Sequence, residues 1–201
     1  MGSYAVFLRG INVGGINIKM ADLREALNAC GFPDALTLLA SGNVVLTSGL
    51  GAAAVKRECE KCLRAAFGYE AWVVVLDAGR VAELVEACPY PDDDRSTHTY
   101  ITLSSDTAVL DELETAGAAL DGAEQKRLGP EALAWLAPAG GTLDSPFSKI
   151  TAKARFKAAT TTRNLRTLVK VRDAAAALNT AQEPVQQKQG ATRTRPSSAR
   201  R

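Results

Sequence analysis

Histidine and aromatic residues are scarce in this sequence, which contains one histidine, His98, and 5% aromatic residues. A single histidine excludes a metal site built from several histidines, and His98 has no accompanying G-x-S-x-G motif of the kind that carries a catalytic serine. We therefore predict no metal site and no histidine-based triad. The sequence also lacks an apolar run of the ~20 residues that a membrane-spanning helix needs, and its first residues lack the basic and apolar regions of a signal peptide. These absences predict a cytoplasmic protein.

Only four cysteines are present, at positions 30, 59, 62 and 88. Cys59 and Cys62 form a C-x-x-C motif, a spacing found in metal sites and redox centres. However, the sequence has no second C-x-x-C to complete a zinc site. On a helix over residues 52–67, both cysteines fall on one apolar stripe of helical period. We therefore predict that they pack in the core as small apolar side chains.

Charge is unevenly distributed, although the formal net charge is only +2. Residues 180–201 contain five basic residues against Glu183, which leaves nineteen basic and twenty-one acidic residues in positions 1–179. This balance is not that of a basic nucleic-acid-binding domain. The segment 180–201 is rich in Gln, Ser, Thr, Pro and Arg without apolar periodicity, which predicts a disordered basic tail. Such a tail either contacts nucleic-acid phosphates weakly or only aids solubility.

The first 78 residues show the pattern of one α+β unit. Two apolar runs are separated by the turn sequence SGN, which predicts a hairpin between two helices. The resulting order βαββαβ is the ferredoxin-like, split β-α-β arrangement. A doubly wound parallel sheet would instead place a helix between the two runs. The predicted elements are a strand at 4–11, a helix at 20–30, strands at 36–40 and 44–48, a helix at 52–67 and a strand at 71–77.

Residues 79–179 partly repeat this pattern and predict a second, smaller α+β half. Within it, the segment 145–159 begins with a helix-start signal and is predicted to be helical, and 162–178 is predicted as the final helix. The other predicted elements are a helix at 80–87, a strand at 98–105, a helix at 107–120, and short strands at 124–129 and 132–138.

The segment LRGINVGG, residues 8–15, joins the first strand to the first helix. It matches neither the Walker pattern G-x-x-x-x-G-K-S/T nor the dinucleotide pattern G-x-G-x-x-G. Gly10, Gly14 and Gly15 could form a backbone nest for an anion, with Arg9 as a bidentate clamp and Lys19 flanking the loop. The alternative is that these glycines only supply unusual backbone angles.

The SGN turn holds Ser41 and Asn43, which would become ligand groups only if the fold brings them near Arg9. Gly42 and Asn43 tolerate left-handed backbone, which is all that a tight turn requires. In the ferredoxin-like topology we place this turn at the opposite end of the sheet from residues 10–15. That placement counts against a shared pocket within the first half.

Basic residues form two rows near the C-terminus. On the predicted final helix, Arg163, Arg166, Thr167 and Lys170 recur at spacings of three and four and so share one face. A second row consists of lysines at 149, 153 and 157. Each row is either a solvated helix face or part of an anion-binding site.

In this order, the motifs LRGINVGG, KM, SGNVV, SK.T and T.RN..T..K resemble a bacterial family of unknown function, DUF1697, over residues 4–170. This family looks like two α+β halves and has no established activity, so the resemblance implies a fold and not a mechanism. Here Leu38 and Ala40 replace the family's usual Tyr and Gln, and Leu165 and Arg166 replace a usual Trp-Asn. The family pattern falls on Arg9, Gly10, Asn12, Gly14, Gly15, Lys19, Met20, Ser41, Gly42, Asn43, Lys149, Thr151, Arg163, Asn164, Thr167 and Lys170.

We predict from these features that the protein binds a small anionic or phosphorylated ligand between its two halves. Arg9 and the loop 10–15 would form one wall, and Lys149, Thr151, Arg163, Asn164, Thr167 and Lys170 the other. The sequence identifies no cofactor and leaves open whether a reaction is catalysed. The alternatives are a protein-interaction module or a nucleic-acid-binding module, although the aromatic run of an RNA-recognition sheet is absent.

Overall fold

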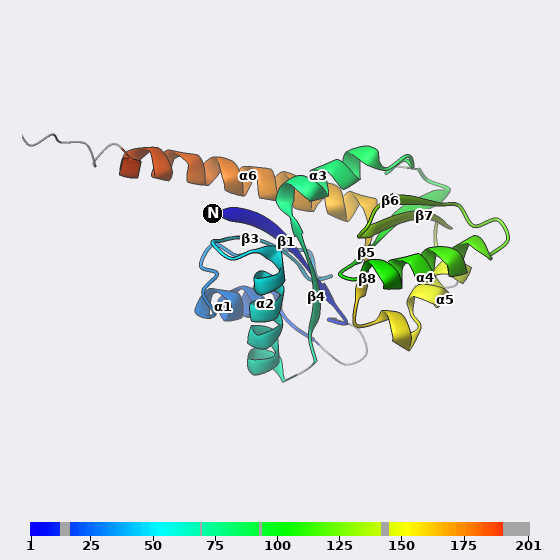
Figure 1. Ribbon diagram of the computed structural model, residues 1–201, viewed down its shortest axis with the longest axis horizontal. Helices are drawn as coiled ribbons and strands as arrows, with labels where there is room; N and C mark the ends of the chain where they lie inside the picture. The colour runs from blue at the N-terminus through cyan, green and yellow to red at the C-terminus, as the bar shows by residue number, and fades with distance from the viewer. Residues whose placement is uncertain (13–16, 69, 93, 142–144, 191–201) are drawn as a thin grey trace, which may run out of the picture.

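The structure is a computed structural model that describes residues 1–12, 17–68, 70–92, 94–141 and 145–190 (Figure 1). Its first unit contains a four-stranded antiparallel sheet of order β2-β3-β1-β4. This strand order and the element order βαββαβ are those of the split β-α-β arrangement. The elements are β1 (Gly2–Arg9), α1 (Met20–Ala29), β2 (Leu36–Leu38), β3 (Asn43–Ser48), α2 (Ala52–Phe67) and β4 (Trp72–Asp77).

The second unit repeats the same topology after a connecting helix. Its antiparallel sheet has the order β6-β7-β5-β8, which places the four strands in the same relative positions as in the first unit. The mixed α+β fold with two halves is therefore confirmed. The elements are α3 (Ala78–Ala87), β5 (Thr97–Ser104), α4 (Thr107–Ala118), β6 (Gln125–Gly129), β7 (Ala132–Pro138), α5 (Pro146–Thr151), the 3-10 turn η2 (Ala154–Phe156), β8 (Thr160–Asn164) and α6 (Leu165–Gly190).

Three apolar clusters fill the spaces around the two sheets. Helices α1 and α2 cover one face of the first sheet, where Leu23 and Leu63 are fully buried. Helices α4 and α5 cover one face of the second sheet, around Trp135. The two remaining sheet faces share a single core with α3 and α6, which lie side by side (Figure 1). Both faces of each sheet are therefore covered.

The segment predicted as a helix from 162 begins instead as a strand. The side chains of Thr160, Thr161 and Thr162 are β-branched, which favours extended backbone. These residues belong to β8, which pairs antiparallel with β5. Arg163 therefore lies on β8 and does not share a helix face with Thr167 and Lys170, so that prediction was wrong. The lysine row also breaks, because α5 ends at Thr151.

The C-terminal helix α6 continues past the predicted end at residue 178 and reaches Gly190. In Figure 1 it extends beyond the sheets on the side away from the second unit. The predicted disorder of the tail, as far as it concerns residues 191–201, lies outside the described residues. No described helix has the length and apolar character to span a bilayer.

The C-x-x-C cysteines occupy core positions, as predicted, but one of them is also bonded. Cys62 forms a disulfide with Cys30 at the end of α1, a pairing that the sequence analysis did not predict. Cys59 is a fully buried free thiol, and burial, with smaller effects of Glu60 and Glu58, raises its pKa to about 12. Across the described residues, no group of three or more His, Cys, Asp or Glu side chains gathers as metal ligands.

Candidate functional site

The loop after β1 and the turn between β2 and β3 lie at the same end of the first sheet. Strands β1 and β2 both pair antiparallel with β3, so they run in the same direction and end at the same edge. The Leu8 amide donates to the Gly42 carbonyl at 2.8 Å, and Asn12 Nδ2 donates to the Ala40 carbonyl at 2.5 Å. The sequence-based placement at opposite ends was therefore wrong.

This shared end forms one side of a cavity of about 390 Å³. The other side is β8 of the second unit, so the cavity lies between the two halves of the chain. Of the predicted site residues, Gly14 and Gly15 lie outside the described residues. The described residues that line the cavity are Leu8, Gly10, Ile11, Asn12, Ala40, Ser41, Thr161 and Arg163.

Left-handed backbone conformations concentrate around this cavity. Gly10 has φ +75° and Gly42 has φ +73°, and a Cβ atom on Gly42 would lie 2.4 Å from Ile11 Cδ1. Within the described chain, only two non-glycine residues have positive φ, and both are in these segments: Asn12 (+56°) and Leu39 (+59°). Glycine adopts such a conformation without strain, whereas the strain of a non-glycine residue at positive φ is often stored at functional sites.

The Asn12 amide braces the loop that follows β1. Its Oδ1 accepts from the Ile18 amide at 2.9 Å, while its Nδ2 donates to the Ala40 carbonyl. Asn43, which is fully buried, plays the corresponding role in the turn, since its Nδ2 donates to the Leu38 carbonyl at 2.9 Å. Both asparagines therefore fix the cavity walls.

Arg163 is 7% exposed and projects from β8 against both of these segments. Its Nε donates to Asn43 Oδ1 at 2.5 Å, and Nη2 donates to the carbonyls of Leu8 (2.5 Å) and Gly42 (3.1 Å). Nη1 donates to Thr161 Oγ1 at 2.7 Å and to the Thr162 carbonyl at 2.9 Å. All five guanidinium N–H groups are therefore used.

Arg9 makes the reciprocal connection from the first unit to the second. Its Nη1 donates to the carbonyl and the hydroxyl of Thr160, and its Nη2 donates to the Thr151 carbonyl at 3.2 Å. The side chain does not line the cavity. It therefore joins the two units in this structure, whereas the sequence analysis had predicted a clamp on the ligand.

These two arginines carry charge that no carboxylate neutralises among the described residues. Every acceptor of Arg9 and Arg163 is a carbonyl, an amide oxygen or a hydroxyl. Burial lowers the pKa of Arg9. Burial, together with the nearby charge of Arg9, lowers the pKa of Arg163 to about 10. The electrostatic environment at this end of the cavity is therefore positive.

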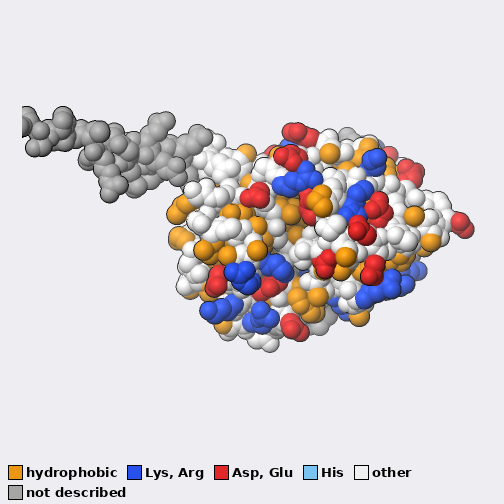
Figure 2. Space-filling model, viewed as in Figure 1, with side chains coloured by type: hydrophobic (Ala, Val, Ile, Leu, Met, Phe, Trp, Pro, Cys, Tyr) orange, Lys and Arg blue, Asp and Glu red, His pale blue; other side chains and the backbone are white. Residues whose placement is uncertain are grey.

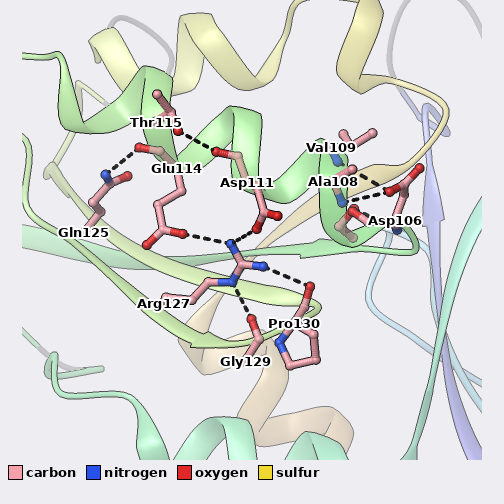
Figure 3. A network of polar contacts seen from close by, with 11 residues as sticks. Asp106, Ala108, Val109, Asp111, Glu114, Thr115, Gln125, Arg127, Gly129 and Pro130 are labelled. Carbon is pink, nitrogen blue, oxygen red and sulfur yellow. Dashed lines mark hydrogen bonds and ion pairs between the residues drawn. The ribbon is translucent and has the colours of Figure 1, made fainter.

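Other arginines of the chain show the usual arrangement. Arg127 Nη1 lies 2.9 Å from Asp111 and 2.8 Å from Glu114, while the same guanidinium donates to the carbonyls of Gly129 and Pro130 (Figure 3). Arg80 pairs with Glu83 and Glu131. Arg163 therefore lacks the carboxylate partner that Arg127 and Arg80 have.

The remaining predicted site residues lie elsewhere. Lys19 and Lys149 are exposed, and Asn164 Oδ1 accepts from the Arg166 amide at the start of α6 (2.9 Å). Thr167 and Lys170 lie on α6 and do not line the cavity. Residues that sequence reasoning missed are Thr160 and Thr161, for which the run of three threonines was the available signal of a strand, together with the apolar lining residues Leu8, Ile11 and Ala40.

The nucleic-acid alternative drew on the open sheet face that ferredoxin-like proteins use for RNA. That face is covered here, since Ala5 and Phe7 are fully buried in the core shared with the second unit. Acidic and basic side chains are interspersed over the molecular face in Figure 2. Neither observation favours nucleic-acid binding by the described residues.

The fold is thus a pair of split β-α-β units that share one core and enclose a cavity with a buried, unneutralised arginine. The chain belongs to the family described as "Protein of unknown function (DUF1697)", whose model matches residues 1–133. The matched range includes the loop after β1 and the SGN turn, whereas β8 and α6 lie beyond it.

Among solved structures, the chain is similar to the conserved bacterial protein SP0830 from Streptococcus pneumoniae. The TM-score is 0.72 at 21% sequence identity, over 87% of this chain and 98% of that chain. At this identity the similarity shows the fold alone. No curated protein matches the chain.

Proposed function

We propose that the cavity between the loop after β1, the SGN turn and β8 binds a small anionic ligand. The supporting observation is the buried guanidinium of Arg163, whose partners are all neutral. A charge taken out of water without a countercharge carries a large desolvation penalty. An anion in the cavity would supply that countercharge where the local dielectric is low and the attraction is strong.

The guanidinium would act through its charge and not as a clamp, because its N–H groups are already used. Ser41 provides a direct contact: its Oγ accepts from Asn43 Nδ2 at 3.0 Å, which leaves the hydroxyl hydrogen to donate to a ligand. Ser41 is exposed and lines the cavity. The field of Arg163 and the Ser41 hydroxyl would together favour a phosphate or carboxylate group.

A thermal-shift experiment with matched charge variants tests this proposal. The ligand panel contains inorganic phosphate, acetate, phenyl phosphate and adenosine monophosphate. A ligand present at one hundred times its Kd adds about 2.7 kcal/mol of stability, which raises the Tm of a chain of this size by about 5–10 °C.

Ala40→Asp places a carboxylate on the cavity wall, whereas Ala139→Asp places one on an exposed turn outside it. We expect the shift to disappear in Ala40→Asp and to persist in Ala139→Asp. The proposal would be contradicted if none of the four anions raised the Tm, or if the two variants lost the ligand-induced rise in Tm equally.

A further inference from the structure

We propose, building on the function above, that the ligand is an organic phosphomonoester or carboxylate that bears an apolar group. Inorganic anions and polyphosphates would bind less well. The inference rests on the size of the cavity, on its apolar wall and on the single cation that lines it.

The cavity is larger than an inorganic oxyanion requires. Its volume of about 390 Å³ compares with about 30 Å³ for one water molecule in the liquid. A tetrahedral oxyanion is only a few times larger than a water molecule, so most of the cavity would stay wet around it. Cavities above about 300 Å³ are typical of sites for organic molecules.

Three of the eight described lining residues carry apolar side chains. Leu8 and Ile11 are 1% and 5% exposed and still reach the cavity, and Ala40 lines the side formed by the turn. Gly42 makes this wall possible, because a Cβ at that position would overlap Ile11. An apolar ligand group against this wall would remove both surfaces from water, which is favourable in proportion to the area buried.

The charged part of the lining suits a ligand with one or two negative charges. Arg163 is the one charged side chain among the described lining residues, and Arg9, whose charge also acts on it, points toward Thr151 and Thr160. A polyphosphate would bring three or more negative charges to a wall with few free donors. The excess charge would lie against Leu8 and Ile11 without partners.

Leu39 adds to the apolar character of this end of the molecule. It is 43% exposed, directly precedes Ala40, and holds a left-handed conformation that a leucine rarely adopts. Exposed large apolar side chains are few in the described chain: Met1, Leu36, Leu39 and Leu50.

Isothermal titration with three probes tests the inference: inorganic phosphate, phenyl phosphate and inorganic tripolyphosphate. Burial of about 60 Å² of a phenyl ring corresponds to about tenfold in affinity. We therefore expect phenyl phosphate to bind at least tenfold more tightly than phosphate, and tripolyphosphate to bind no more tightly than phosphate.

Two isoleucines supply a matched pair of variants. Ile11 and Ile18 are 5% and 4% exposed and belong to the same core cluster, but only Ile11 lines the cavity. Ile11→Val removes one methylene, so we expect the preference for phenyl phosphate over phosphate to fall three- to fourfold. In Ile18→Val the preference should remain unchanged.

The outcomes separate this inference from the proposed function. If none of the three probes binds, the proposed function and this inference are both refuted. If phosphate and phenyl phosphate bind equally, or tripolyphosphate binds most tightly, anion binding stands and the apolar group is refuted. The assignment of Ile11 to the apolar wall would be refuted by either of two results. In one, Ile11→Val leaves the preference for phenyl phosphate over phosphate intact; in the other, Ile18→Val reduces that preference as much as Ile11→Val does.

Discussion

Replacement of Arg163 by alanine tests the central element of the site, the buried guanidinium that joins the two units. In the variant, the carbonyls of Leu8 and Gly42 and the side chain of Asn43 lose their donor. In the folded protein these groups are buried, since Arg163 is 7% exposed and Asn43 is fully buried.

Two opposing effects determine how much stability Arg163→Ala loses. Each hydrogen bond to a charged group contributes about 1.5–3 kcal/mol, and Arg163 donates five. The desolvation of a buried charge without a carboxylate removes several kcal/mol of that gain. We therefore expect Arg163→Ala to lower the free energy of unfolding by about 3–4 kcal/mol. Since domains are typically stable by about 5–15 kcal/mol, the variant should still fold.

Urea unfolding followed by circular dichroism measures this loss. Arg166→Ala is the matched control, because Arg166 lies three residues away, is exposed and follows the strand on which Arg163 sits. It should change the free energy of unfolding by less than about 0.5 kcal/mol. A loss below 1 kcal/mol for Arg163→Ala, or equal losses in both variants, would refute the argument that this guanidinium holds the units together.

Three further predictions follow from local geometry. Gly42→Ala should be less stable than Gly10→Ala by about 1–3 kcal/mol, because both glycines have the same left-handed φ but only at Gly42 would the new Cβ overlap a neighbour; thermal unfolding of the pair checks this. Leu39→Gly should raise the free energy of unfolding by about 1 kcal/mol, because glycine relieves the positive φ at this position. Leu36 has the same 43% exposure but lies in β2, so Leu36→Gly should lower the free energy of unfolding by about 0.5–1 kcal/mol. Urea unfolding of both variants measures the two changes. Cys30→Ser opens a disulfide that spans 32 residues, and should lower the stability of the oxidised protein by about 3–4 kcal/mol but leave the reduced protein nearly unchanged in the same assay.

The first unit could be predicted from sequence because its signals are local. Apolar positions at helical spacing defined α1 and α2, and the SGN turn between two apolar runs defined the hairpin β2–β3. Each of these signals lies within about fifteen residues of chain. The split β-α-β arrangement then followed from the element order βαββαβ without any long-range information.

The site was only partly predictable, because its key contacts join residues more than a hundred positions apart. Arg163 and Asn43 were both candidates, yet the 2.5 Å bond between them depends on how β8 packs on the first unit. The regular spacing of Arg163 with Thr167 and Lys170 indicated a helix face. The preceding threonine run, which favours a strand, outweighed that signal.

The pairing of Cys30 with Cys62 was beyond the sequence for a related reason. It depends on the packing of α1 against α2, 32 residues apart, and the C-x-x-C motif drew attention to the pair 59 and 62 instead. Disulfides are rare in reducing compartments, so this bond and the predicted cytoplasmic location are in tension. Thiol titration of the unreduced, denatured protein would show whether the disulfide forms. Two free thiols mean that the bond is formed, and four mean that it is not.

A second arginine of the chain holds a hairpin turn, as Arg163 does, but with a different set of acceptors. In the second unit, the turn between β6 and β7 occupies the position that the SGN turn has in the first, and Arg80 holds it by donating to the Leu128 carbonyl and to Glu131. That arginine is neutralised where it acts. If the sole role of Arg163 were to hold its turn, a carboxylate would serve there equally well and would offset the penalty of burial. Its neutral acceptors hold the turn and leave the positive charge beside the cavity, where it is available to an anion.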